Sequence, residues 1–286
     1  MQYCRLFTVP VAFFDLIPWS LSFNVRNIIP HAIYNCHKKI SMLQYTAKEF
    51  LPIVAVAPGK GGWMEKLRQI AIDGPVGVGK STVAKLVAKE LGFAYIDTGA
   101  MYRAAAYFLL EKNTELGDQT AVCEKLQELR VRFDEKQCVF VNEKDVTNQI
   151  RTQGISESAS VIASYACVRT KLVKLQQDMA TKLSVVMDGR DIGSFVLPDA
   201  ELKIYLDAEL DIRAWRRHGD LLAKGIEADF EEVKKETAIR DERDMNRKES
   251  PLIKTPDAIV IDTGGIDINE VAGRILSQFA KINTLE

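Results

Sequence analysis

The sequence predicts an α/β protein in which a five-stranded parallel sheet is flanked by helices. Short apolar runs of strand length alternate with longer amphipathic stretches from Leu67 onward, which is typical of βαβ units. Each run ends close to a polar or acidic residue, as buried parallel strands do. The expected strands are Gln69–Ile72, Phe93–Ile96, Val185–Met187, Leu202–Leu206 and Ile259–Ile261.

The composition of the 286-residue chain suits a globular protein with a sizeable core, since 47% of its side chains are apolar and 27% are charged. Its 38 lysines and arginines balance 39 acidic residues, so the net charge attracts neither nucleic acid nor an anionic membrane. Prolines and charged residues interrupt the most apolar stretch before it reaches the ~20 residues of a membrane-spanning helix. We expect a monomer without nucleic-acid or membrane partners.

Residues 1–63 do not share the pattern of the rest of the chain. Asp15 and Glu49 are their only acidic residues, and no helical or strand period persists through them. Two interpretations stay open: a targeting segment of an organellar protein, or a stretch upstream of a true start at Met64. We expect residues 64–286 to be the folded domain and the protein to be cytoplasmic.

The five cysteines are expected to be reduced thiols. They stand at positions 4, 36, 123, 138 and 167, an odd number with uneven spacing and no CxxC pair or histidine at metal-ligand spacing. This pattern favours a cytosol-like compartment over structural disulfides or a zinc site.

Two segments break the alternation of strands and helices. Between residues 115 and 153, Val131–Phe133 and Val139–Val141 have the composition of short strands joined by a polar turn, which indicates a small inserted lobe. Residues 209–230 are rich in charge and contain Gly219 and Gly225, a composition that indicates a helical lid. We expect the insert and the lid as additions to one domain.

The segment directly after the first expected strand fits the phosphate-binding pattern GxxxxGK[ST], a P-loop. An expected helix, Ser81–Leu91, follows it, with apolar residues at helical spacing and Gly92 at its end. Glycines permit close backbone approach, and the N–H groups at the start of the helix form an anion cradle. The residues expected to hold ATP are Gly74, Pro75, Val76, Gly77, Val78, Gly79, Lys80, Ser81 and Thr82.

Three polar side chains are expected to act on phosphate and metal. Lys80 can bridge the β- and γ-phosphates of ATP, and the Ser81 hydroxyl can ligate Mg²⁺. Asp188 follows an apolar strand, a position from which a carboxylate supports Mg²⁺ directly or through water. A strand-end cap is the alternative interpretation of Asp188. The P-loop does not identify the acceptor, because many unrelated activities share it.

A phosphate acceptor would require several arginines from separate segments, because two facing phosphates must be neutralised. Arg103 and Arg190 follow the second and third strands, at the edge where open α/β sheets bind ligands. Arg240, Asp244 and Arg247 lie on one face of a helix expected from about residue 230 to 246. A solvated face of salt bridges is the alternative interpretation of this helix.

Three further arginines, Arg213, Arg216 and Arg217, share a face of the expected lid helix and are candidates to close over the triphosphate. The three histidines need no catalytic role, because a phosphate acceptor is already ionised near neutral pH. The expected catalytic residues are Lys80, Arg103, Arg190, Arg216 and Arg217.

From Ile70 to near its C-terminus, the chain closely resembles bacterial-type cytidylate kinases, members of the P-loop nucleoside monophosphate kinases. The resemblance rests on five motifs in the family's order and approximate spacing: Ile72–Pro75 (IDGP), Asp97–Arg103 (DTGAMYR), Ile150–Gln153 (IRTQ), Asp188–Gly193 (DGRDIG) and Arg240–Arg247 (RDERDMNR). It implies transfer of the γ-phosphoryl group of ATP, with Mg²⁺, to CMP and dCMP. It also implies that the insert is the family's monophosphate-binding addition.

The resemblance implies a role for each matched residue. Ser160, Arg169 and Asp191 would face cytosine with Thr98 nearby, Arg103 and Arg190 would hold the CMP phosphate, and Arg240, Asp244 and Tyr102 would hold the sugar; Arg247 belongs at the site without a defined role. Thr98 stands where serine is common, a mild departure that keeps the hydroxyl. Residues 1–63 have no counterpart in the family.

Base chemistry supports the same assignment independently. Cytosine donates from its N4 amine and accepts at N3 and O2. Asp191 can accept, and Arg169 and Ser160 can donate. Uracil reverses two of these groups and would leave buried polar atoms mispaired, so we expect CMP to be preferred over UMP.

Two rival functions stay open from the sequence. One is another small P-loop kinase acting on UMP, AMP or a metabolite alcohol. The other is a binding module whose ATP site regulates a partner. Rates of ADP formation with each acceptor would separate them.

The expected lid generates the first testable prediction. If it closes over the triphosphate and excludes water, Arg216→Ala or Arg217→Ala lowers turnover with little loss of CMP specificity. Steady-state rates with CMP and UMP measure both quantities. Unchanged turnover in both variants would contradict a catalytic lid.

Overall fold

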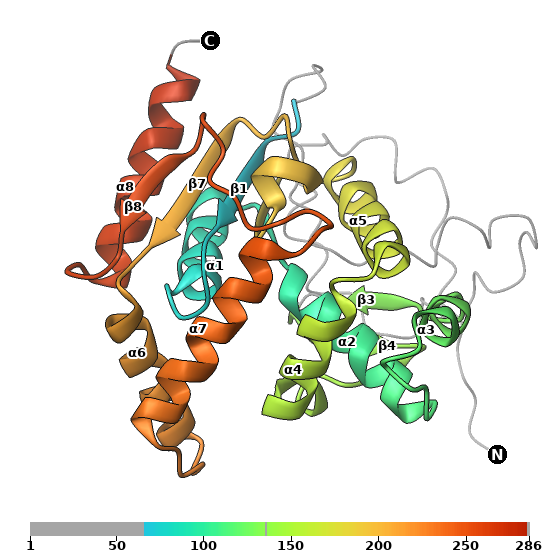
Figure 1. Cartoon of the computed structure of the whole chain (residues 1–286). Coiled ribbons are helices and arrows are strands. Elements are labelled where there is room, and N and C mark those ends of the chain that lie inside the picture. Colours follow the sequence, from blue (N-terminus) through green and yellow to red (C-terminus); the bar gives the residue numbers. More distant parts are fainter. Residues whose placement is uncertain (1–65, 135, 285–286) are drawn as a thin grey trace, which may run out of the picture. The chain divides into compact units, whose positions relative to one another are not determined.

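The computed structural model describes residues 66–134 and 136–284, so the expectations for residues 1–63 and for a start at Met64 lie outside the described residues. A five-stranded, all-parallel sheet in the order β2-β6-β1-β7-β8 forms the centre of the fold (Figure 1). Its strands are β1 (Gln69–Asp73), β2 (Ala94–Asp97), β6 (Val185–Gly189), β7 (Leu202–Asp207) and β8 (Ile259–Asp262).

All five predicted strands are confirmed, but each ends one or two residues later than expected, and β2 also begins one residue later. The polar residue that marks each strand's end still takes part in the ladder, as where Asp73 lies opposite Gly189. Polar residues can occupy these last positions because the carboxyl edge of the sheet borders the ligand site rather than the core.

Helices cover both faces of the sheet. They are α1 (Lys80–Leu91), α2 (Thr98–Glu111), α3 (Gln119–Leu126), α4 (Gln153–Ile162), α5 (Ala166–Ala180), α6 (Leu210–Ala223), α7 (Phe230–Asn246) and α8 (Ile268–Asn283). A 3₁₀ turn (Gln149–Arg151) precedes α4, and a π turn (Ile192–Val196) follows β6. Gly92 ends α1 in the left-handed conformation with φ of 68°, as its position predicts.

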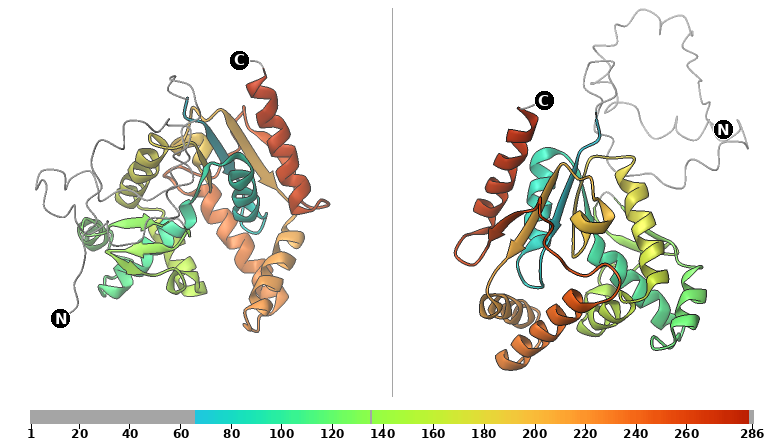
Figure 2. Two further views of the ribbon diagram at one scale, coloured as in Figure 1. Left: turned by 180° about the vertical axis from the view of Figure 1, so that it is seen from behind. Right: turned by 45° about the horizontal axis from the view of Figure 1, so that its top comes forward.

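The sheet separates two apolar layers because alternate side chains of a strand point to opposite faces. Ile70 and Ile72 of β1 pack with α1 and α8, which lie side by side in Figure 2. Ala71, between them, belongs to the layer that contains α2 and α5. Burial on both faces explains why the strands read as continuous apolar runs.

The insert contains α3 and a three-stranded antiparallel sheet of β3 (Val131–Phe133), β4 (Val139–Val141) and β5 (Lys144–Asp145). The two predicted strands are confirmed. The third, β5, was not predicted, because its two exposed charged residues carry no strand signal. Val131 and Val139 are buried in the same core as α2, so the insert is an extension of the main core.

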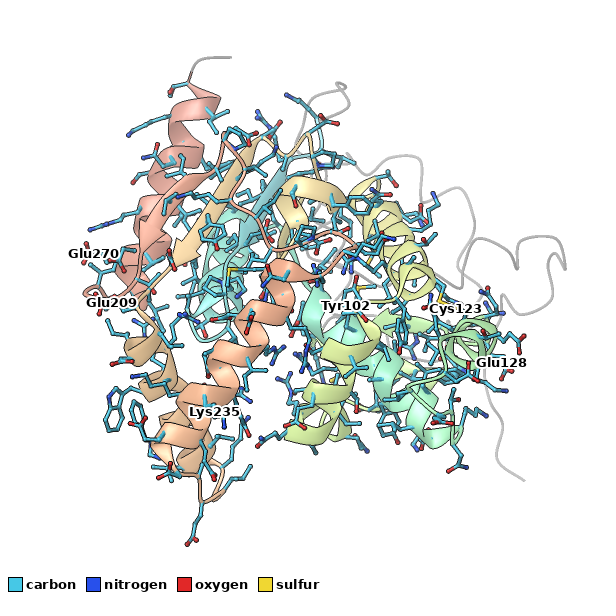
Figure 3. The ribbon with its side chains drawn as sticks, viewed as in Figure 1. Tyr102, Cys123, Glu128, Glu209, Lys235 and Glu270 are labelled. Carbon is cyan, nitrogen blue, oxygen red and sulfur yellow. A yellow bond between two sulfur atoms is a disulfide. The ribbon has the colours of Figure 1, made fainter. Side chains whose placement is uncertain are left out.

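The expectation of reduced cysteines is wrong for one pair. Cys123 of α3, labelled in Figure 3, forms a disulfide with Cys167 of α5 across 44 residues of sequence, while Cys138 is a free, partly buried thiol. Packing of α3 against α5 brings the two Cα atoms to 5.7 Å, well inside the usual range for a disulfide. The spacing of the cysteines in the sequence does not predict the contact between α3 and α5. The cysteines at positions 4 and 36 lie outside the described residues.

Within residues 66–134 and 136–284, no helix is both long and apolar enough to cross a membrane.

The disulfide generates a prediction about stability. Closing a loop between residues 44 positions apart lowers the entropy of the unfolded chain, which corresponds to about 4 kcal/mol in the chain-entropy treatment. Cys123→Ser and Cys167→Ser should each lower the free energy of unfolding in urea without reductant, and Cys138→Ser should change it little. With dithiothreitol, the free energy of unfolding of the wild type should fall to that of Cys123→Ser and Cys167→Ser. Equal stability of the reduced and oxidised wild type would contradict the disulfide.

Candidate functional site

A pocket of about 370 Å³ lies at the carboxyl edge of the sheet, between the P-loop, α2, α4 and α7. It collects residues from the P-loop, the segments after β2 and β6, the expected lid and α7. Sixteen of the predicted site residues line it: Val76, Gly77, Lys80, Ser81, Thr98, Tyr102, Arg103, Ser160, Arg169, Asp188, Arg190, Asp191, Arg217, Arg240, Asp244 and Arg247. Six do not: Gly74, Pro75, Val78, Gly79, Thr82 and Arg216.

The P-loop has a glycine in an unusual backbone conformation at each end, Gly74 after β1 and Gly79 before α1. Gly74 has φ of 149°, and a Cβ there would lie 2.1 Å from the carbonyl oxygen of Leu206 on the adjacent strand β7. Gly79, with φ of 85°, precedes α1 and provides no side-chain cap. The first N–H groups of α1 are thus available to an anion, which the helix dipole also favours. Gly74 and Gly79 shape the cradle without lining it.

Lys80 lies buried beneath the loop. Its Nζ donates to the carbonyl oxygens of Gly74 at 2.7 Å and Pro75 at 2.6 Å. Burial and then the nearby Arg190 guanidinium hold the pKa of Lys80 well below its ordinary value. A phosphate anion would counter both effects, so this ammonium favours binding of a highly charged ligand.

Asp241 of α7 anchors the tip of the P-loop. The backbone N–H of Val76 donates to Asp241 Oδ1 at 3.1 Å, and Arg213 forms an ion pair with the same carboxylate. Arg213 also donates to the backbone carbonyls of Val76 and Ala208. Both charged side chains are buried, so they tie α6 and α7 to the loop.

Of the three arginines on the expected lid helix, two have partners away from the pocket lining. Arg213 is engaged with Asp241, and the Arg216 guanidinium donates to the Oγ1 of Thr263 at 2.9 Å and to its carbonyl at 2.5 Å. Only Arg217 lines the pocket. The helical spacing predicted their shared side of α6 correctly, but α7 and the loop after β8 approach that side and bind two of them.

The predicted metal site pairs two oxygen donors. Ser81 Oγ donates to Asp188 Oδ2 at 2.7 Å, and Asp188 is 4% exposed at the carboxyl end of β6. A hydroxyl beside one carboxylate suits Mg²⁺, which takes few protein oxygens and completes its shell with water and phosphate. The described residues contain no group of three or more acidic, histidine or cysteine side chains that could hold a metal alone. Burial and the neighbouring Asp97 raise the pKa of Asp188 to about 6.

Arg190, Arg240 and Arg103 give the pocket its positive end. Arg190 Nε donates to Asp244 Oδ2 at 2.8 Å, and Arg103 Nη2 donates to Asp97 Oδ2 at 3.2 Å. Burial and the repulsion of Arg190 lower the pKa of Arg240 to about 10. Burial alone would raise the pKa of Asp244, but Arg190 and Arg240 outweigh it and hold that pKa below its ordinary value. The surplus of guanidinium groups is suited to an anionic ligand.

Asp191, elsewhere in the pocket lining, lies between two arginines. Arg169 pairs with its Oδ2, and Arg247 Nη2 lies 3.4 Å from its Oδ1. The Arg169 guanidinium also lies 5.6 Å from the ring centroid of Tyr102, which Figure 3 labels on α2. All three charged side chains are nearly buried, so a donor and an acceptor are fixed next to each other.

Three hydroxyl groups complete this end of the pocket. Thr98 Oγ1 donates to the carbonyl of Asp188 at 2.6 Å, and Ser160 Oγ accepts from Arg243 Nη1 at 3.2 Å. The Tyr102 hydroxyl is buried without a partner, and burial raises its pKa to about 12. A buried donor without a partner that lines a pocket is available to a ligand.

Asp73, Asp241 and Arg151 stand inside the matched motifs, but the sequence predicted no role for them. Asp73, at the end of β1, accepts the N–H groups of Ile192 at 2.9 Å and Gly193 at 2.7 Å and so fixes the turn after Asp191. Its place at a strand end was the available signal. Asp241 lies in the charged run Arg240–Asp244, and no pattern in a single sequence distinguishes a buried acidic residue from an exposed one there. Arg151 lines the pocket from the turn before α4.

Comparisons with known proteins point to one enzyme family. The family described as cytidylate kinase matches residues 70–281. A cytidylate kinase from Streptococcus mutans is 50% identical over 72% of this chain and 93% of its own, and one from Oceanobacillus iheyensis is 46% identical over 77% and 97%. Among solved structures, a shikimate kinase from Bacteroides thetaiotaomicron is similar over 74% of this chain and 98% of its own, with 13% identity and a TM-score of 0.40.

The Asp241 anchor can be tested by removing its carboxylate. Asp241→Ala leaves Arg213 buried and unpaired and frees the Val76 N–H, so the free energy of unfolding should fall by about 3–5 kcal/mol. The KM for ATP should rise in the protein that remains folded. Urea unfolding and steady-state kinetics measure the two effects, with the exposed neighbour Glu242→Ala as control. Equal behaviour of the two variants would contradict the anchor.

Proposed function

This chain belongs to the cytidylate kinase family, and from that premise we propose how its pocket performs the reaction: the γ-phosphoryl group of ATP passes to CMP or dCMP, giving CDP or dCDP and ADP. One observation supports this proposal above the others. A single pocket joins a P-loop to a cluster of partly buried arginines from α2, the segment after β6, and α7. Two phosphate-binding ends facing each other suit transfer between two phosphates.

The donor half is the P-loop with Ser81 and Asp188. In our proposal the loop amides and Lys80 hold the triphosphate, and the Ser81 hydroxyl with the Asp188 carboxylate, directly or through water, holds Mg²⁺. When bound, the metal would neutralise charge on the phosphates. Lys80 would leave the carbonyls of Gly74 and Pro75 to meet the phosphates.

The acceptor half is the arginine cluster. Arg103 and Arg190 would bind the phosphate of CMP, and Arg240 with Asp244 and Tyr102 would bind the sugar. The unpartnered hydroxyl of Tyr102 supports that sugar contact. The attacking oxygen of CMP is ionised near neutral pH, so no general base is needed and catalysis depends on positioning and charge.

Cytosine would lie against Asp191, Arg169 and Ser160. Asp191 would accept from N4, and Arg169 and Ser160 would donate to the acceptors at N3 and O2. Arg247, the residue without a defined role from sequence, helps to hold Asp191. Uracil would present a carbonyl to Asp191, and the cost of that mispairing is the basis for discrimination.

Arg217 is the lid residue that we propose to act on the triphosphate. It lines the pocket from α6, whereas Arg216 is held by Thr263. Closure of α6 would exclude water and prevent loss of ATP by hydrolysis. We further propose a monomeric, cytoplasmic protein that uses ATP with Mg²⁺ and binds neither nucleic acid nor membrane.

A coupled assay of ADP release tests the proposed function. CMP, dCMP, UMP, AMP and shikimate are offered one at a time with ATP and Mg²⁺. We expect fast turnover with CMP and dCMP and slow turnover with the others. Activity with UMP or AMP alone would overturn the cytidylate assignment, and tight ATP binding without turnover of any acceptor would indicate a binding module.

Base recognition can be tested at Asp191. In Asp191→Asn, the amide can both accept from N4 of cytosine and donate to O4 of uracil, so the preference for CMP over UMP should fall by about a hundredfold. The ratio of kcat/KM values measures it. Lys174→Ala, in an exposed i,i+4 pair on α5, serves as control and should keep the wild-type ratio. An unchanged ratio in Asp191→Asn would remove Asp191 from base recognition.

A further inference from the structure

Asp188 has a second hydrogen-bond partner that the reaction described above does not use. The Tyr95 hydroxyl donates to Asp188 Oδ1 at 2.8 Å, while Ser81 Oγ donates to Oδ2 at 2.7 Å. Both carboxylate oxygens are therefore engaged, one by each neighbour. A carboxylate fixed at both oxygens cannot rotate about its last torsion without breaking a hydrogen bond.

Tyr95 is itself held rigidly. It lies on β2, next to β6, in register with Val186, and its side chain is buried in the layer that contains α1. It is 7% exposed, and the ammonium of Lys85 lies 5.5 Å from its ring centroid. A tyrosine is a protonated donor at neutral pH, so its hydroxyl presents a hydrogen to the carboxylate. The sheet thus sets the direction from which Asp188 is held.

We propose that Tyr95 is a positioning residue for the donor half of the site: its hydroxyl fixes the Asp188 carboxylate so that Oδ2 faces Ser81 and the Mg²⁺ of the bound nucleotide. Tyr95 does not line the pocket and acts through Asp188. Hydrogen bonds to a buried charge contribute more than neutral ones, and a conformation fixed before binding lowers the entropic cost of binding.

The inference deepens the proposed function, because it rests on the role of Asp188 toward Mg²⁺. It goes beyond that role because it makes the orientation of Asp188 toward the metal depend on Tyr95, a side chain on another strand. A purely structural tyrosine would affect the folded protein whether or not Mg²⁺ is present. A positioning tyrosine affects specifically the gain in nucleotide affinity that Mg²⁺ provides.

The test is Tyr95→Phe in the full chain, which removes one oxygen and keeps the ring. Binding of a non-hydrolysable ATP analogue is measured by calorimetry in EDTA and in Mg²⁺, together with the Mg²⁺ dependence of turnover. We expect affinity in EDTA to stay near the wild-type value and the gain from Mg²⁺ to fall about tenfold, as for loss of one hydrogen bond to a charged group. The Mg²⁺ midpoint of turnover should rise correspondingly.

A matched control is available at Tyr165. Its hydroxyl also makes one 2.8 Å hydrogen bond, to the carbonyl of Leu116, away from the pocket. Tyr165→Phe therefore also loses one tyrosine hydrogen bond of this length, to a neutral acceptor, and should keep the wild-type gain from Mg²⁺. Equal loss of ATP affinity with and without Mg²⁺ in Tyr95→Phe would mean a structural role and would overturn the inference.

Asp188→Asn, alone and combined with Tyr95→Phe, separates failure of this inference from failure of the metal assignment. If Tyr95 acts through Asp188, removing the hydroxyl in the Asp188→Asn background changes the gain from Mg²⁺ little further. Fully additive effects would overturn the inference. A normal gain from Mg²⁺ in Asp188→Asn would overturn the metal assignment on which it rests, whereas an effect in Asp188→Asn with none in Tyr95→Phe would refute the role of Tyr95 alone.

Discussion

The parallel pairing of β1 with β6 is the constraint on which the site depends. It places Ile72 opposite Asp188 and Asp73 opposite Gly189, so the P-loop and the segment carrying Arg190 and Asp191 leave the sheet at one edge. These segments are more than a hundred residues apart in sequence. A slip of one residue in this pairing would turn Asp188 to the opposite face of the sheet and separate it from Ser81.

Charge balance is the second principle of the site. Arginines gathered in or near the interior repel one another, and three of them are held by specific acids: Arg190 by Asp244, Arg169 by Asp191, and Arg213 by Asp241. Burying such pairs costs desolvation free energy, so they fix the geometry of the site more than they stabilise the fold. The arginines of the acceptor side remain in surplus over their acids, and a bound phosphate would complete the balance. This explains why the pocket is built for an anion although the chain as a whole is nearly neutral.

The insert and α5 form a further unit around the end of the pocket that Asp191 and Arg169 line. α5 carries Arg169 and, two residues earlier, Cys167, whose disulfide reaches α3 of the insert. The insert shares its core with α2, the helix that carries Tyr102 and Arg103. The acceptor side thus rests on elements connected to one another by apolar packing and one covalent bond. The donor side rests instead on the P-loop, α1 and the anchor at Asp241.

The sequence by itself determined the sheet, the P-loop and the identity of most pocket residues. Apolar runs of strand length and the GxxxxGK[ST] pattern are local signals, because they follow from burial on both faces and from the backbone that phosphate requires. The tertiary structure alone decided which charges meet. The sequence does not distinguish Asp241 from Glu242, but in the fold Asp241 accepts a hydrogen bond from the P-loop. Likewise, Arg216 differs from Arg217 only because the loop that carries Thr263 binds it. Tyr95 and the cysteine pair were equally hidden. Partners of this kind come from distant segments, and their choice depends on packing distances that no local pattern encodes.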